Sequence, residues 1–152
     1  MYLPEYIGML QSGEQQLAEA FTVLAQRHGE DLEVRDMSRI LASWSRQHAQ
    51  ALSALAQRFG ATPSREPEAL RRTLFAGVRT GPLGLMRDLQ DTWLLGQQVS
   101  LNWLVLSQAA RALRDADFQA TCERLSGETK RQLDWLQARV NDAAPELLSV
   151  PA

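Results

Sequence analysis

The sequence predicts an all-α protein, a bundle of four long helices arranged as two antiparallel hairpins and joined by a long crossover that contains a short helix. Apolar residues recur at alternating steps of three and four through four stretches, the spacing of helices packed at a small angle. The first two stretches and the last two are separated by only a few residues, which forces antiparallel neighbours. The middle connection is much longer, long enough to run from one end of a bundle to the other.

The composition is that of one globular domain over residues 1–152, with 45% hydrophobic and 22% charged residues and a net charge of -2. This charge gives no electrostatic reason to expect binding to nucleic acid or to an anionic membrane. No window reaches the roughly 18 apolar residues of a membrane helix, and the N-terminus lacks the features of a signal peptide. The single cysteine, Cys122, fits a reducing compartment, so we expect a cytoplasmic protein.

In the first hairpin we expect helices over residues 4–28 and 32–59. Gly29 stops the first helix, Asp31 caps the second, and Gly60 ends it. In each helix one position of the apolar stripe is polar, Glu14 in the first and His48 in the second. The apolar positions are Ile7, Leu10, Leu17, Phe21 and Leu24, then Val34, Met37, Leu41, Trp44, Ala51 and Leu55.

The long connection, residues 61–82, is the least regular part of the chain. A short helix at 67–75 is expected inside it, and several glycines break up the remainder. If the connection crosses the length of the bundle, the second and third helices run parallel.

In the second hairpin we expect helices over 85–114 and 118–143, with Asp117 as the cap of the last helix and Pro145 beyond its end. The apolar stripe positions of the last helix are Phe118, Cys122, Leu125, Leu136 and Val140, and two consecutive positions between them are polar, Thr129 and Gln132. The third helix has the widest apolar face, which predicts that it is the most buried. Its stripe is Leu85, Leu89, Thr92, Gly96, Val99, Trp103, Leu106, Ala110 and Leu113, widened by Leu94, Leu95, Leu101, Leu104 and Val105.

Counting from the turns places the polar stripe positions at one depth. Glu14 and His48 are nearly equidistant from the first turn, and Thr129 and Gln132 are at a similar distance from the second. If the second and third helices are parallel, His48 lies near Asn102. The sequence therefore predicts one buried polar layer, drawn from all four helices and made of Glu14, Ser45, His48, Gln98, Thr129 and Gln132.

With this pattern the whole chain resembles the ferritin-like superfamily. The segments LQDTWLLGQQVSLNW and ETKRQLDWL also resemble bacterial ferritin-like proteins. The di-iron members of that superfamily carry a Glu on each of two helices and a Glu-x-x-His pair on each of the other two. The resemblance implies a ferritin-like four-helix bundle and a site at the depth of the polar layer.

Carried over residue by residue, the resemblance implies that most of the metal ligands have been replaced. Glu14 matches the first-helix glutamate, and Ser45-x-x-His48 keeps the histidine of its pair but not the glutamate. Thr129-x-x-Gln132 keeps neither ligand. On the third helix the counterpart is Gln98 or Ser100, without a carboxylate.

Two iron ions need about four carboxylates to offset their charge, whereas this layer offers one glutamate and one histidine. We therefore expect no di-iron chemistry and no cofactor. Three interpretations of Glu14 and His48 stay open. They are a buried hydrogen-bonded pair supported by Ser45, Thr129 and Gln132, ligands of a single divalent metal completed by water, or residues of which one or both lie at the surface.

Other candidate residues have structural interpretations. His28 at a helix C-terminus is favoured by the helix dipole, and Cys122 on the apolar stripe is an inert core thiol. Trp44, Trp93, Trp103 and Trp135 are interpreted as core residues. Arg65, Arg71, Arg72 and Arg79 are interpreted as a solvated face.

The leading hypothesis is a non-enzymatic ferritin-like protein that has lost its di-metal site and acts by binding. The sequence contains no phosphate-binding loop, no Cys-x-x-Cys and no nucleophile motif. We expect a homodimer formed through helix faces, with any other protein partner unknown. One alternative is a mononuclear metal protein that uses Glu14 and His48. Another is a small-ligand carrier with a pocket lined by the tryptophans.

Overall fold

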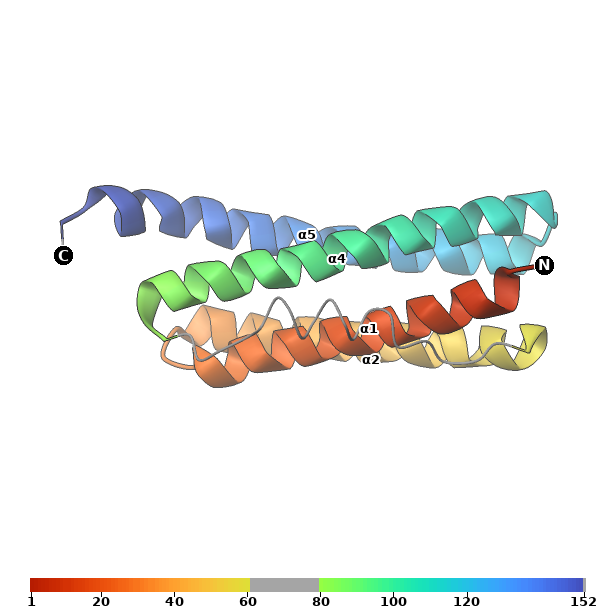
Figure 1. Cartoon of the computed structure of the whole chain (residues 1–152), viewed down its shortest axis with the longest axis horizontal. Helices are drawn as coiled ribbons and strands as arrows, with labels where there is room; N and C mark the ends of the chain where they lie inside the picture. Colours follow the sequence, from red (N-terminus) through yellow and green to blue (C-terminus); the bar gives the residue numbers. More distant parts are fainter. Residues whose placement is uncertain (61–79, 152) are drawn as a thin grey trace.

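Four long helices lie side by side in the computed structural model, which describes residues 1–60 and 80–151 (Figure 1). The prediction of an all-α bundle of four helices is confirmed. The predicted short helix at 67–75 and the four arginines of the long connection fall outside the described residues. The helices are α1 (Leu3–Arg27), α2 (Leu32–Phe59), α4 (Gly81–Ala112) and α5 (Ala116–Ser149).

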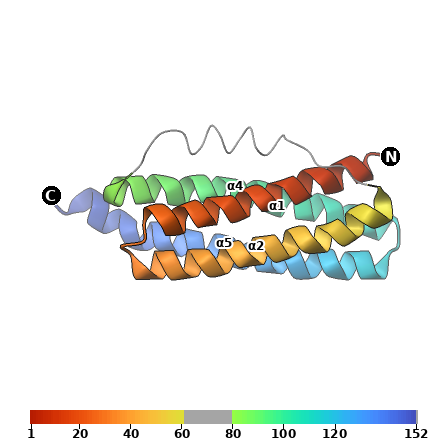
Figure 2. The ribbon, with the colours of Figure 1, turned by 90° about the horizontal axis from the view of Figure 1, so that it is seen from below.

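The helices form two antiparallel hairpins, α1 with α2 and α4 with α5, and the hairpins pack together mainly through α1 and α4. On the diagonal of the bundle, α2 and α4 run in the same direction (Figure 1, Figure 2). The end of α2 and the start of α4 therefore lie at opposite ends of the bundle. No helix in the described part of the chain combines the length and the hydropathy needed to cross a membrane.

Most of the predicted apolar positions lie in the core. Leu113 is an exception, 47% exposed, because α4 has already ended at Ala112. The predicted positions that are buried are Ile7, Leu10, Leu17, Phe21 and Leu24 on α1, Val34, Leu41 and Leu55 on α2, Leu89, Val99, Trp103, Leu106 and Ala110 on α4, and Phe118, Cys122, Leu125 and Leu136 on α5.

The first hairpin begins and ends its helices almost as predicted. The Asp31 side chain accepts a hydrogen bond from the backbone N–H of Val34, and Gly60 ends α2 in the left-handed conformation with φ of 72°. At the end of α1 the C-cap is His28 and Gly29 follows it directly, as predicted for a glycine that stops the helix, although Gly29 is not among the described glycines with positive φ.

The second turn corrects the predicted helix cap. Asp115 caps α5 by accepting from the backbone N–H of Phe118 at 3.0 Å, whereas Asp117 lies within the first turn of the helix. The chain reverses at Arg114, whose φ is 52°, so the helix starts earlier than expected. Asp115 also forms an ion pair with Arg58 at the end of α2.

The end of α5 also differs from the prediction, because the helix passes through Pro145 and continues to Ser149. A proline inside a helix removes one backbone hydrogen bond and crowds the preceding turn. The added turn places Leu147 beside Leu85 and Pro82 of α4, around a common hollow. α5 thus extends beyond the point where local sequence would end it.

The prediction that the third helix is the most buried is wrong. Leu95 is buried, but four of the residues expected to widen the buried face point outward. In an antiparallel four-helix bundle each helix has two neighbours, so a wide apolar face extends past the contact region. The outward residues are Leu94 at 45%, Leu101 at 59%, Leu104 at 54% and Val105 at 43% exposure.

Candidate functional site

The two residues at the centre of the predicted layer are in direct contact. His48 Nδ1 on α2 lies 2.6 Å from Glu14 Oε2 on α1, and both side chains are buried. The interpretation in which one or both of these residues lie at the surface is therefore wrong. A buried carboxylate needs a charged or hydrogen-bonding partner, and His48 supplies one.

A second carboxylate, which the sequence interpretation missed, lies on the other side of the His48 ring. Glu128 on α5 places Oε2 3.0 Å from His48 Nε2, and its side chain is 32% exposed. The signal in the sequence was weak, because Glu128 stands one residue before Thr129 and outside the apolar stripe. His48 therefore links α1 to α5 through a fully buried carboxylate and one that reaches the solvent.

The two carboxylates determine the charge of His48. Burial by itself would lower the pKa of His48, but hydrogen bonding and attraction to Glu14, and then to Glu128, outweigh it and hold the pKa above the ordinary value. A ring with an acceptor at each nitrogen is best satisfied when both nitrogens carry a proton. The raised pKa favours the positively charged form of the His48 ring, in which each nitrogen can donate to one of the two carboxylates.

The second contact in the layer joins α5 to α2. Gln132 Nε2 donates to the backbone carbonyl of Leu41 and to Ser45 Oγ, each at 2.9 Å. Ser45 is one helical turn before His48, so the two contacts lie next to each other across the same pair of helices. Ser45 and Gln132 thus pair with each other in the core.

The third and fourth helices contribute differently from what was predicted. Thr129 is buried, but its hydroxyl donates to the carbonyl of Leu125 on its own helix. Gln98 and Ser100 are only half-buried. The α4 contribution is Trp103, which is fully buried and donates from Nε1 to Glu14 Oε2 at 3.3 Å.

We define the polar layer by the residues that the structure brings together: Glu14, Ser45, His48, Trp103, Glu128 and Gln132. Two buried oxygens in it, Glu14 Oε1 and Gln132 Oε1, have no hydrogen-bond partner among the described residues. Both accept hydrogen bonds and cannot donate, so each calls for a donor or a cation.

A second buried cluster of charged and polar side chains lies at the C-terminal end of α1. His28 Nε2 is 2.8 Å from Asp88 Oδ2 on α4, and Arg27 Nη1 is 3.5 Å from the same oxygen. The main contact of His28 is thus with Asp88, whereas the sequence interpretation had considered only the helix dipole. Asp88 lies three residues after Leu85 and four before Thr92, a spacing that could have identified it as buried.

The tryptophans and the cysteine do not form a common site. Trp103 is in the core, whereas Trp93 borders an open hollow near Leu94 and Val140. Trp44 and Trp135 pack against the core and are partly buried. Cys122 is buried, and burial raises the pKa of its thiol to about 11, which makes it a poor nucleophile.

The described residues contain no group of three or more His, Cys, Asp or Glu side chains arranged to hold a metal ion. Neither protein-family models nor curated proteins nor solved structures gave a match to this chain. The ferritin-like resemblance therefore stays a prediction from the residues and the helix arrangement.

Proposed function

We propose that this chain is a ferritin-like bundle that has lost its di-metal centre and that acts by binding rather than by catalysis. The carrying observation is that each ring nitrogen of His48 faces a carboxylate from a different helix, Glu14 at 2.6 Å and Glu128 at 3.0 Å. The two carboxylates lie at opposite edges of the ring. A single metal ion bound to one nitrogen of His48 therefore could not also be bound by both carboxylates. The role that we propose for the hydrogen bonds of this layer is to fix how the helices align along their length.

The helix arrangement supports the ferritin-like part of this proposal. Two antiparallel hairpins with α2 parallel to α4 are what a bundle with one long crossover requires. The layer draws residues from all four helices at the depth where the resemblance expects ligands. Its acidic groups are Glu14 and Glu128, too few for two iron ions.

One observation favours a rival function, a site for a single cation. Glu14 Oε1 and Gln132 Oε1 are buried acceptors without donors among the described residues, and hard cations bind such oxygens. A cation bound to Glu14 Oε1 would use the oxygen that does not contact His48 and would not need the histidine as a ligand. This differs from the mononuclear site predicted from the sequence, which used Glu14 together with His48.

Metal analysis separates the two functions. We expect purified protein without a histidine tag to contain substoichiometric metal, and addition of Mn²⁺, Fe²⁺ or Zn²⁺ to leave its melting temperature unchanged. Stoichiometric metal that is lost in Glu14→Gln, and retained in the control His28→Ala, would overturn the proposal. The control is matched because His28 is also a buried histidine paired with a carboxylate, but outside the polar layer.

Binding requires a surface, and the second hairpin offers one. The outer side of α4 carries exposed leucines, and the space between α4 and α5 is hollowed. We propose that this side of the bundle makes the contact through which the protein acts.

A further inference from the structure

The outer side of α4 carries an apolar ridge, which we define as Leu101, Leu104 and Val105, between 43% and 59% exposed. Single exposed leucines are common on soluble proteins, but these lie within residues 92–110, which contain no charged side chain at all. Depletion of charge around exposed apolar residues is the compositional mark of the centre of an interface. By contrast, the exposed side of α5 carries charged residues along its length, from Asp117 to Glu146.

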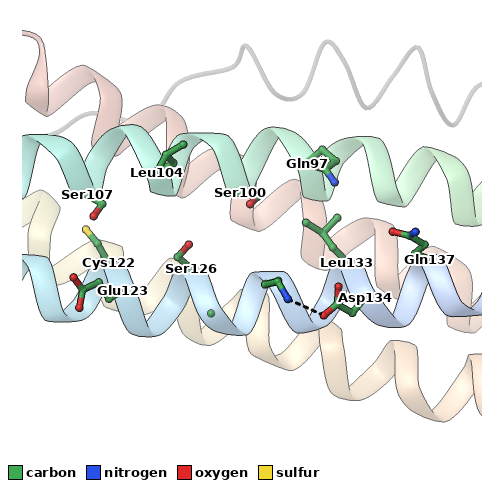
Figure 3. A pocket seen from close by; sticks show the side chains of 12 residues that line it. Gln97, Ser100, Leu104, Ser107, Cys122, Glu123, Ser126, Leu133, Asp134 and Gln137 are labelled. Carbon is green, nitrogen blue, oxygen red and sulfur yellow. Dashed lines mark hydrogen bonds and ion pairs between the residues drawn. The ribbon is translucent and has the colours of Figure 1, made fainter.

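A groove lies directly beside this ridge, between α4 and α5, with a volume of about 570 Å³ (Figure 3). Several of the residues that line the groove are small, and a Cβ placed on Gly127 would meet nothing within 4 Å. Figure 3 shows Ser107, Cys122 and Ser126 pointing into the space between the two helices. Small residues on both helices leave room there for side chains from outside.

The groove continues along the hairpin. A second hollow of about 490 Å³ lies between Trp93 and Leu94 on α4 and Val140 on α5, and Gln137 borders both hollows. At 1.5 Å per residue, the bordered part of α4, residues 90–107, is roughly 25 Å long. With two helices about 10 Å apart, the surface measures roughly 25 by 20 Å, the order of size of one side of a small stable interface.

We infer that this surface binds a second copy of the chain about a two-fold axis, so that the ridge of each copy lies in the groove of the other. This inference rests on the proposed function and names its partner. A two-fold interface needs one patch that is complementary to itself, and a ridge beside a parallel groove meets that condition. A different partner would need only one of the two features.

The charges favour the same arrangement. Around the groove, Lys130 and Asp134 form an ion pair at 3.5 Å, and Glu123 is also exposed. Because the ridge is uncharged, it can cover this rim without placing like charges together or burying an unpaired charge of its own.

The oligomeric state of matched variants tests this inference. We expect a dimer in light scattering after gel filtration and in sedimentation equilibrium. Leu101→Glu alters the ridge and Gly127→Leu fills the groove, and since each change occurs twice in a two-fold dimer, each should weaken dimerisation roughly 100-fold. Ile40→Glu, at a 46% exposed apolar residue of α2, is the control and should remain dimeric. Circular dichroism checks that all variants are folded.

Mixing the two interface variants is the sharper measurement. A mixed dimer of Leu101→Glu and Gly127→Leu retains one intact ridge in one intact groove, so the mixture should contain more dimer than either variant alone. A dimer that both variants leave intact would overturn the inference, as would a monomeric wild-type protein. A wild-type monomer whose stability falls in Leu101→Glu would also overturn it, because Leu101 would then be covered by another part of the same chain. None of these outcomes concerns metal, so the proposed function is judged separately by the metal analysis.

Discussion

The contact between Glu14 and His48 allows a quantitative prediction from a double-mutant cycle. His48→Leu removes hydrogen bonds of 2.6 and 3.0 Å and leaves the fully buried Glu14 with the 3.3 Å contact from Trp103. Breaking a buried charged pair by removing one partner costs about 3–5 kcal/mol. Glu14→Leu should cost less, about 1–3 kcal/mol, because His48 keeps Glu128, which reaches solvent.

The double variant should be less destabilised than the two single variants predict together. With both residues replaced by leucine, no charge is left stranded in the core, and apolar replacement of a buried pair is often neutral or better. We expect a coupling energy of about 2 kcal/mol or more, measured by urea unfolding at one fixed protein concentration.

The matched control combines Glu14→Leu with His28→Leu. His28 is paired with Asp88 in a separate cluster, so these two changes should be additive to within about 0.5 kcal/mol. If Glu14→Leu and His48→Leu are themselves additive within that limit, the pair does not act as a unit and the role assigned to the polar layer is refuted.

Two further measurements test the structure. Because the folded-state pKa of His48 is raised, its stabilising contribution is complete below the ordinary histidine pKa of about 6.5 and is lost as the pH rises through the folded value. The difference in unfolding free energy between wild type and His48→Leu should therefore shrink from pH 6 to pH 9, and a difference that grows would contradict the assigned charge. At the second turn, Asp115→Ala should cost about 1–2 kcal/mol through the lost cap and the ion pair with Arg58, whereas Asp117→Ala should cost only about 0.5 kcal/mol through the helix dipole. Equal losses would contradict the assignment of the cap.

The helices and the centre of the layer were predictable because both depend on regular spacing. The apolar stripe fixes which side of each helix faces inward, and a short antiparallel turn fixes relative depth. Counting from the first turn therefore predicted correctly that Glu14 and His48 lie at the same depth. Across the two hairpins the predicted depth was also close, since Gln132 contacts Ser45, and Trp103, the neighbour of the predicted Asn102, lies beside the His48 ring.

The missed residues show where spacing stops being informative. Glu128 reaches His48 from a partly exposed position, because its side chain is long enough to extend inward from the edge of the helix face. The apolar pattern could not distinguish core from surface on α4, because leucine is equally apolar on either side of the helix. Only the positions of the neighbouring helices decide that question. Likewise, α5 continues past Pro145 to Ser149, which a rule based on local sequence does not predict.

The polar contacts between α2 and α5 explain why a bundle without a metal would retain a buried layer. Among the neighbouring helix pairs these two approach each other least closely, and long side chains bridge them at successive heights. Arg139 pairs with Asp31 and Glu33 at one end, and Arg58 pairs with Asp115 at the other. The polar layer lies between these ends.

Apolar side chains alone would tolerate a slip of one hairpin along the other, because one helical turn of about 5.4 Å brings the next stripe residue into a similar place. The polar contacts do not tolerate it. A slip of one turn would separate His48 from Glu128 and Gln132 from Ser45 at once, leaving several buried groups unpaired. A buried polar residue that fixes register is well attested in helical assemblies, and here the same hypothesis applies to two hairpins. On this hypothesis the hydrogen bonds of the layer specify how the two halves of the bundle align.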